Sequence, residues 1–263
     1  MKLHKIALAL SLVAFAMPLT ALAQDAAEPA EEATEAAAQE AAPAAEATAE
    51  EESTSNLSWN LSVTSDYVFR GITQTDFDPA VQGGLDYAFG DSGWYVGAWA
   101  SNIDFAASDG PDIELDTYVG YGGSLSDEWA FDVHAVQYTY IGEQDSYGSL
   151  DYMEFFIGTT FNDILTLTYA YAPDYANADI SSSYLGAAGS WEVGSGFSLN
   201  AGLGYSKFSD DVGSYTDWNL GVSRSFGPVE AALTYYDTTG DYVDFLYDGK
   251  ASDQVVLSFK IGG

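Results

Sequence analysis

The sequence contains no cysteine and few basic residues. Among its 263 residues are 7 Lys and Arg against 40 Asp and Glu, so the formal net charge is −33 at pH 7. This balance argues against nucleic acid as a partner, because phosphate recognition needs a basic surface. Without cysteine an exported chain cannot rely on disulfides, so its stability must come from backbone pairing and apolar burial.

Long apolar runs are also missing beyond the N-terminus. After residue 23 no stretch approaches the roughly 20 apolar residues that a membrane helix needs, so a membrane could be crossed only by strands. The one early run, from Ile6 to Met17, follows Lys2 and Lys5 and precedes Ala21-Leu22-Ala23. This order predicts a secretory signal peptide over residues 1–23.

Residues 24–55 have neither a basic nor an aromatic side chain. They consist almost entirely of Ala, Glu, Pro and Thr and include ten acids. Such a segment cannot bury enough apolar surface to offset its chain entropy, so we expect a disordered acidic arm. It is either a solvated spacer or an arm that contacts a periplasmic partner, and the folded domain is expected over 56–263.

The remainder alternates between apolar and polar residues along most of its length. The first example places Leu57, Trp59, Leu61 and Val63 on one face, and the pattern extends this strand through Tyr67 and Phe69 to Arg70. We count about twelve strands of roughly nine to twelve residues, a length that crosses a bilayer when tilted. The fold class predicted is all-β: a transmembrane antiparallel up-and-down β-barrel. A secreted β-sandwich is the soluble alternative, but its strands are shorter.

Turn lengths alternate along the predicted strands. Short turns such as Asn162-Asp163 and Gly227-Pro228 follow the even-numbered strands, while longer, Asp-rich loops follow the odd-numbered ones. In bacterial outer-membrane barrels the short turns face the periplasm, so both termini are expected there. The pattern leaves open which residues of 94–105 face the lumen.

The polar parity of these strands predicts a set of side chains that line the lumen. Acids dominate the set and would favour cations in a narrow wet channel, although they could instead only hydrate the lumen or share protons. The set contains two basic residues, Arg70 and Lys260. We expect Arg70 to form a structural ion pair near Asp66 and Asp86. The alternative is that Arg70 contacts a permeant solute. The candidates are Asp66, Arg70, Asp86, Glu114, Asp116, Asp132, Glu154, Glu192, Glu230 and Lys260.

Motifs for catalysis, metals and cofactors are not found. His134 is the only histidine after signal cleavage and has Asp132 nearby, but no spacing ties a serine to it as a barrel hydrolase would require. The acidic groups Asp210-Asp211 and Asp241, Asp244 and Asp248 lack calcium-loop spacing. We therefore expect no enzyme activity, no metal and no cofactor.

The opening hairpin and the strands after it resemble a known family. The segments are Ser65 to Thr75, Asp78 to Gly84, Gly93 to Phe105 and Glu114 to Tyr121. Together they resemble the TorF family of porin-like proteins, also described as the Gcw_chp group of proteobacterial proteins. The resemblance implies an outer-membrane barrel from Asn56 onward and does not specify a solute.

The sequence thus predicts an outer-membrane channel for passive diffusion of small hydrophilic solutes, favouring cations or neutral species. Side chains or an inward loop could narrow or close a barrel of this size. The alternative is a non-conducting structural or adhesive barrel that acts through its extracellular loops. Expected partners are membrane lipids, lipopolysaccharide and permeant solutes, with no nucleic acid, and the pattern does not fix an oligomeric state.

Overall fold

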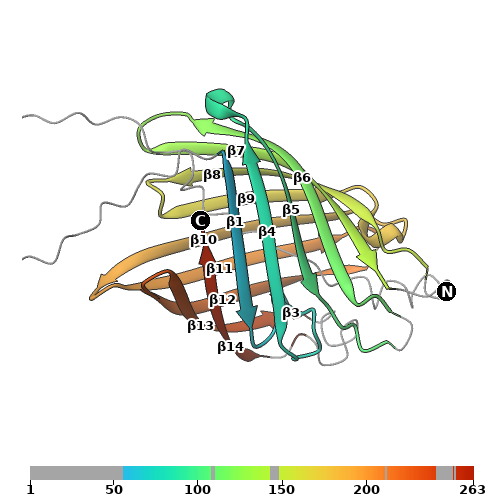
Figure 1. Cartoon of the computed structure of the whole chain (residues 1–263). Helices are drawn as coiled ribbons and strands as arrows, with labels where there is room; N and C mark the ends of the chain where they lie inside the picture. Colours follow the sequence, from blue (N-terminus) through green and yellow to red (C-terminus); the bar gives the residue numbers. More distant parts are fainter. Residues whose placement is uncertain (1–55, 108–109, 143–147, 211, 241–250, 252) are drawn as a thin grey trace, which may run out of the picture.

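The computed structural model describes residues 56–263 except 108–109, 143–147, 211, 241–250 and 252. The predicted signal peptide and acidic arm lie outside the described residues. Twelve strands form the closed barrel drawn in Figure 1. In chain order they are β1 (Leu57–Thr64), β4 (Ala80–Ala88), β5 (Trp94–Asn102), β6 (Ile113–Ser124), β7 (Trp129–Ile141), β8 (Tyr152–Phe161), β9 (Leu165–Ala172), β10 (Ser182–Gly194), β11 (Phe197–Phe208), β12 (Gly213–Phe226), β13 (Val229–Thr239) and β14 (Gln254–Gly262).

The barrel closes by pairing its first and last strands. Each barrel strand is antiparallel to its neighbours, and β1 pairs with both β4 and β14. Asn60 lies opposite Gly262, and the backbones of Trp59 and Gly263 exchange two hydrogen bonds of 2.8 and 3.0 Å. Closure leaves no exposed strand edge within the barrel. The predicted twelve-stranded antiparallel barrel is confirmed.

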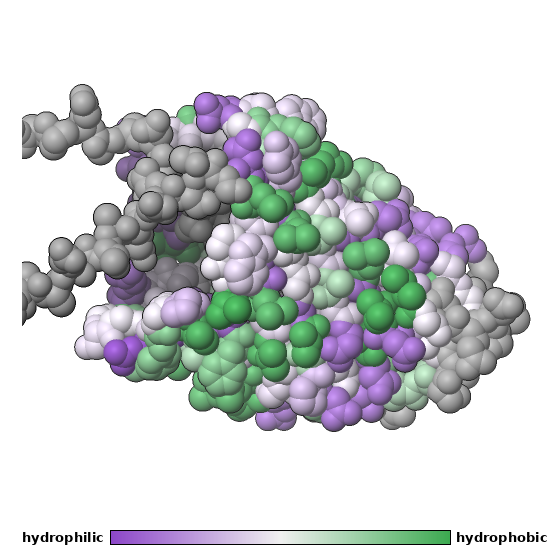
Figure 2. Space-filling model, viewed as in Figure 1, coloured by the Kyte–Doolittle hydropathy of each residue, from purple (hydrophilic) through white to green (hydrophobic). Residues whose placement is uncertain are grey.

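The outer surface of the barrel is apolar. Alternate residues such as Leu185, Leu203 and Leu257 are exposed on its outside, and Figure 2 shows hydrophobic side chains gathered over the strands at the front. This is the surface that a barrel presents to hydrocarbon, with lumen-facing residues at the other parity. Over the part of the chain described, no helix is long and apolar enough to span a membrane.

Aromatic pairs stand between neighbouring strands near their ends. Trp94 lies opposite Tyr121 with ring centroids 5.2 Å apart, and Trp129 lies opposite Phe161 at 4.8 Å. Cross-strand aromatic pairs stabilise a sheet, and aromatic side chains suit the edge of an apolar band. Both pairs therefore suit the edges of the apolar band.

Short turns and long loops lie at opposite ends of the barrel. The short turns include the 3-10 helix η2 (Gly90–Ser92), and β1 begins and β14 ends at the same end. The 3-10 helix η3 (Tyr175–Asn177) belongs to a long loop at the other end. On β5, whose facing the sequence left open, Trp99 and Ser101 are buried inside while Trp94 and Val96 are exposed outside.

The first strand is shorter than predicted. It ends at Thr64, and residues 65–79, which we call the inward loop, are largely buried instead of continuing along the barrel wall. Tyr67 and Phe69, predicted on the outer face, are 6% and 2% exposed. The prediction failed because hydroxyls of the loop itself hydrogen-bond the Asp66 carboxylate and fold the chain back on itself, as described below.

Candidate functional site

The inward loop carries a small hairpin at its tip. Its strands β2 (Val68–Phe69) and β3 (Ile72–Thr73) pair with Val68 opposite Thr73 and Phe69 opposite Ile72. The turn between them is Arg70-Gly71, with φ of 42° and 78°. Two positive φ values in a two-residue turn match a type I′ hairpin, which glycine and asparagine favour. Arginine at positive φ is strained, so its surroundings must hold it there.

Asp66 organises the base of this hairpin. Its Oδ1 accepts hydrogen bonds from the hydroxyls of Thr73 at 2.6 Å and Thr75 at 2.8 Å, while Gln74 donates its side-chain amide to the Ile72 carbonyl at 2.9 Å. Thr73, Gln74 and Thr75 are fully buried. Burial raises the pKa of Asp66 above its ordinary value, and the two threonine hydrogen bonds partly oppose that shift.

Acidification should favour the inserted hairpin through Asp66. A carboxyl with a raised pKa stabilises the inserted state fully below its ordinary pKa of 3.8 and loses that contribution as the pH rises through the raised value. In Asp66→Asn this part of the pH dependence should vanish. Limited proteolysis of the inward loop across the acidic to neutral range, normalised at each pH to an unfolded substrate, measures it, with Asp91→Asn in a short turn as control. Identical pH slopes in wild type and Asp66→Asn would contradict the assignment.

Arg70 pairs with the opposite wall of the barrel. Its guanidinium donates three hydrogen bonds of 3.1 to 3.2 Å to the carboxylate of Glu154 on β8, and both side chains are buried. The guanidinium carbon also lies 4.1 Å from the ring centroid of Tyr184 on β10. Burial lowers the pKa of Arg70, but Glu154 and three neighbouring tyrosines together outweigh that effect, and the pKa is raised. The predicted structural ion pair exists, but its partner is Glu154, across the lumen, because the hairpin carries Arg70 away from Asp66 and Asp86.

The tip of the hairpin rests against β12 and β13. A Cβ added to Gly71 would lie 2.2 Å from Cγ2 of Thr238 and 2.9 Å from Cβ of Asp217. The loop leaves β1 and rejoins the wall at β4, and β13 and β12 are the second and third strands from β1 around the barrel. The Arg70 side chain reaches further, to Glu154 on β8. Asp217 is buried in this contact and was not among the predicted luminal residues.

Gly71→Ala should dislodge the hairpin. The added methyl group has no room against Thr238 and Asp217, and alanine is strained at this φ. Release exposes the Arg70 backbone, so trypsin should cut after Arg70 in folded Gly71→Ala and leave wild type intact there. Mass spectrometry of the fragment that begins at residue 71 reports the cut. Gly227→Ala, in an open short turn, is the matched control, and an uncut Arg70 in folded Gly71→Ala would contradict the packing.

Buried carboxylates surround the inserted hairpin on the strand side. Glu114 and Asp116 on β6 and Glu154 are fully buried, and Glu114 accepts a hydrogen bond of 2.8 Å from the Tyr67 hydroxyl. Neither carboxylate oxygen of Asp116 has a hydrogen-bond partner among the described residues. The predicted candidates Asp66, Arg70, Glu114, Asp116 and Glu154 are thus brought together around the loop. Acidic side chains outnumber basic ones there.

Aromatic rings line the same half of the lumen. Tyr138 and Tyr152 stack at 4.7 Å, Tyr152 contacts Tyr175 at 5.1 Å, and Tyr175 contacts Phe208 at 5.4 Å. Tyr138 also donates its hydroxyl to Glu154 at 3.3 Å. This buried aromatic row packs around the hairpin and was not predicted as part of a site, because each ring taken alone reads as part of an alternating strand.

The other candidates lie in the half of the lumen nearer the short turns. Tyr118 and Tyr95 donate hydroxyl hydrogen bonds of 2.5 and 2.8 Å to Asp86 and Asp132. His134 contacts Asp132 at 2.5 Å and stacks on Phe156. The last three candidates are exposed, with Glu230 opposite Lys260 in the β13–β14 register: Glu192, Glu230 and Lys260.

The lumen is therefore divided into two zones. At the level of the hairpin, side chains from β6, β8 and the loop are 0% exposed, so the lumen is filled there. Toward the short turns, Ala188, Ser190 and Glu192 on the inner parity of β10 are exposed to water. Within the described residues, no group of three His, Cys, Asp or Glu side chains is placed to hold a metal ion.

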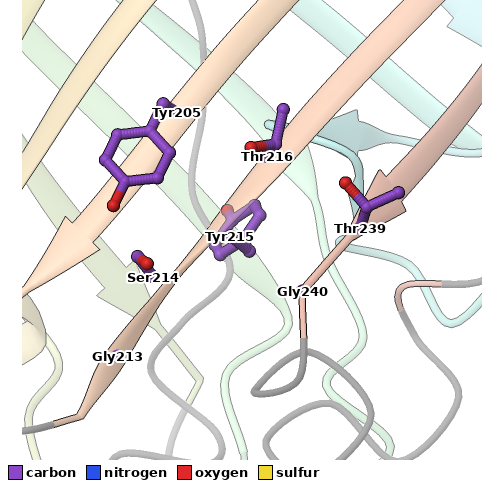
Figure 3. Close-up of a pocket in the computed structure, with 7 residues that line it drawn as sticks. All are labelled: Tyr205, Gly213, Ser214, Tyr215, Thr216, Thr239 and Gly240. Atoms are coloured by element: carbon purple, nitrogen blue, oxygen red, sulfur yellow. The ribbon is translucent and has the colours of Figure 1, made fainter.

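A pocket of about 390 Å³ lies at the long-loop end, between β11, β12 and β13 (Figure 3). Its walls carry hydroxyl groups and no charged side chain, so it adds nothing to the charge around the hairpin. The lining residues are Tyr205, Gly213, Ser214, Tyr215, Thr216, Thr239 and Gly240.

A family model of bacterial proteins of unknown function, Gcw_chp, matches residues 48–260. The chain belongs to the Gcw_chp family. Among solved structures, a KdgM porin aligns with a TM-score of 0.50 at 7% identity, covering 78% of this chain and 96% of that one. A NanC porin aligns with a TM-score of 0.48 at 12% identity, covering 78% and 97%. The first likeness shows a shared barrel fold.

The similarity extends to a larger porin with less overlap. Pseudomonas aeruginosa OprD aligns at 12% identity with a TM-score of 0.37, covering 79% of this chain and 66% of that one. No curated protein matches the sequence. The comparisons therefore give this Gcw_chp protein a family and a fold, and its function has to be argued from the lumen.

Proposed function

We propose that this Gcw_chp protein is an outer-membrane channel for passive diffusion of small hydrophilic solutes, closed at rest by its inward loop. The observation that carries the proposal is the loop itself. It crosses the lumen of a closed barrel and fills one level of it. It is held there by one ion pair, a few hydrogen bonds and the packing of Tyr67, Phe69 and Ile72 inside the barrel. This arrangement fits a gate better than it fits a purely structural role for the loop.

The barrel supplies the two properties that a channel needs. Its outside is apolar, and its inside carries polar and charged side chains with a water-exposed zone near the short turns. A polar interior inside an apolar belt is typical of outer-membrane channels. The KdgM likeness supports this architecture, and the TorF resemblance agrees with it. With the short turns in the periplasm, the inward loop would close the pore from the extracellular side.

The luminal charges favour cations. Acids line both zones. Among the described residues, the basic side chains that face the lumen are Arg70 and Lys260, and Arg70 moves away with the loop. A narrow lumen with fixed carboxylates concentrates cations through its local potential. We therefore expect K⁺ to pass more readily than Cl⁻ once the loop is displaced.

The loop can be removed without breaking the barrel. Thr64 and Ala80, at its two ends, lie directly opposite each other in the β1–β4 register. A short Asn-Gly linker in place of residues 65–79 would join the two strands as an ordinary hairpin. This variant, called the loopless barrel below, separates the gate from the wall of the channel.

Planar-bilayer recording tests the proposal. Wild type should open rarely, and the loopless barrel should give steady current, with heat-modifiable gel migration showing that both are folded. A folded loopless barrel that stays silent would refute the channel. It would favour the alternative of a structural or adhesive barrel, in which the loop is simply part of a filled core.

A further inference from the structure

We infer that the luminal cage that holds Arg70 is a recognition site for organic cations that carry a guanidinium or alkylammonium group. Arg70 is then an internal occupant, and a permeant cation takes its place when the loop leaves. This inference rests on the proposed function, because the solute must reach the cage through the lumen.

The contacts of Arg70 define the chemistry of the cage. Glu154 receives three hydrogen bonds from the guanidinium, and the Tyr184 ring lies against the guanidinium carbon at 4.1 Å. A carboxylate paired with an aromatic face matches a planar cation, which hydrogen-bonds at its edge and stacks on its face. Both groups belong to barrel strands and stay in the lumen when the hairpin moves.

The cage holds more carboxyl groups than Arg70 contacts. Glu154 is the carboxylate that its hydrogen bonds reach, while Asp116 is fully buried with no hydrogen-bond partner for either oxygen among the described residues. One oxygen of Asp217 is likewise buried without a partner there. Unpaired buried carboxylate oxygens are costly, and a second donor group on a cationic solute would satisfy them. This surplus points to a ligand larger and more richly protonated than the side chain now present.

The backbone conformation of the hairpin favours its release from the cage. Arg70 sits at φ 42°, where arginine is strained, so release relieves backbone strain that a free solute does not carry. Against this, the tether gives Arg70 a high effective concentration at the cage. Solute entry therefore competes with a local occupant, and a cation of the right shape would open the channel as it binds.

Arg70→Asn empties the cage while keeping the turn. Asn-Gly is the favoured dipeptide of a type I′ hairpin, so the turn can still form although Glu154 loses its partner, and heat-modifiable gel migration shows that the barrel is folded. Arg70→Gly provides a second version. Methylguanidinium is the probe, and urea is its neutral planar control. Isothermal titration calorimetry of the detergent-folded barrel reads binding without requiring current.

We expect saturable methylguanidinium binding to Arg70→Asn and Arg70→Gly, and no binding of urea. Adding Glu154→Gln should weaken binding at least tenfold, and adding Tyr184→Leu should weaken it severalfold. Adding Glu192→Gln, an exposed luminal change in the other zone, should leave it unchanged. The same probe should block current through Arg70→Asn channels with the same order of variants.

Two outcomes would overturn the inference, and neither depends on conduction. Folded Arg70→Asn and Arg70→Gly that bind no methylguanidinium would show that the cage is only a structural ion-pair site. Binding that is insensitive to Glu154→Gln would place the cation elsewhere. Silence in the bilayer with normal calorimetric binding would refute the channel and leave the cation site standing.

Discussion

Glu154→Gln is expected to release the inward loop and open the channel. The substitution keeps the size of the side chain and removes the charge that compensates Arg70. Breaking one partner of a buried ion pair costs about 3–5 kcal/mol, because the remaining charge stays buried without compensation. At about 1.4 kcal/mol per factor of ten, the ratio of inserted to released loop should fall on the order of 10²- to 10³-fold.

Two independent readings report this release. Trypsin should cut folded Glu154→Gln after Arg70, and bilayer recordings should show a large rise in open time. Glu192→Gln is the matched control, since it removes a luminal glutamate that lies in the exposed zone near the short turns, away from Arg70. Glu154→Gln with wild-type protection of Arg70 and wild-type open time would show that the ion pair does not hold the loop.

Loss of the buried carboxylates should abolish most of the cation preference. In the loopless barrel, Glu114, Asp116 and Glu154 face the lumen without Arg70, so their combined potential controls ion entry. A potential of several kT enriches cations by roughly tenfold or more. Asp116→Asn together with Glu114→Gln should therefore move the K⁺ to Cl⁻ permeability ratio most of the way to that of a neutral pore.

The reversal potential across a KCl gradient measures this shift. The control is Asp163→Asn in the loopless barrel, which removes an acid from a short turn outside the lumen and should leave the reversal potential unchanged. If the double variant keeps the full cation preference, the buried carboxylates do not set selectivity. The acids near the short turns, Asp86 and Asp132, would then be the next to test.

The barrel could be predicted because its main determinant, the alternation of apolar and polar side chains, acts within each strand. Each strand must place apolar side chains outward and polar ones inward, so a period of two recurs through segments such as Phe197 to Tyr205. Turn lengths follow from the same up-and-down topology. Sequence alone therefore indicated the strand number, the antiparallel order and the alternation of short turns with long loops.

The inward loop could not be predicted from that pattern. Tyr67 and Phe69 keep the parity of Leu61 and Val63, and alternation does not distinguish a residue that faces lipid from one buried inside the barrel. The turn at Thr64 depends on hydrogen bonds from Thr73 and Thr75 to Asp66. Sequence reasoning allowed for an inward loop in general, and the Arg70-Gly71 turn was the available signal for this one.

The contacts between the loop and the opposite wall of the barrel also could not be predicted from the sequence. Arg70 and Glu154 are 84 positions apart, and only the closed barrel places β8 opposite the loop. Asp217 was not included among the predicted luminal residues, although its parity on the strand is luminal. Its neighbours Trp218 and Leu220 are apolar and lie on the outer parity. The candidates were correctly assigned to one lumen, but their division into a buried and a wet zone required the loop.

A disulfide between the hairpin tip and the barrel wall tests the gate most directly. In Gly71→Cys/Asp217→Cys/Thr238→Ala the two cysteine Cβ positions are 2.9 Å apart, somewhat closer than the usual 3.5–4.5 Å, so a small shift of the tip allows the bridge. Thr238→Ala removes the methyl group that would otherwise lie 2.2 Å from a Cβ at residue 71, and the bridge holds the tip against the wall. The native chain has no cysteine, so no other bridge competes. Asp217→Cys/Thr238→Ala, which cannot form the bridge, controls for the loss of the carboxylate, for the change at Thr238 and for the reductant.

The same molecules are then recorded before and after reduction in a planar bilayer. The account predicts a silent barrel while the bridge is intact, as verified by mass spectrometry, and steady cation-selective current once reduction frees the hairpin. Equal current in the bridged and reduced states would contradict the claim that the inward loop closes the channel.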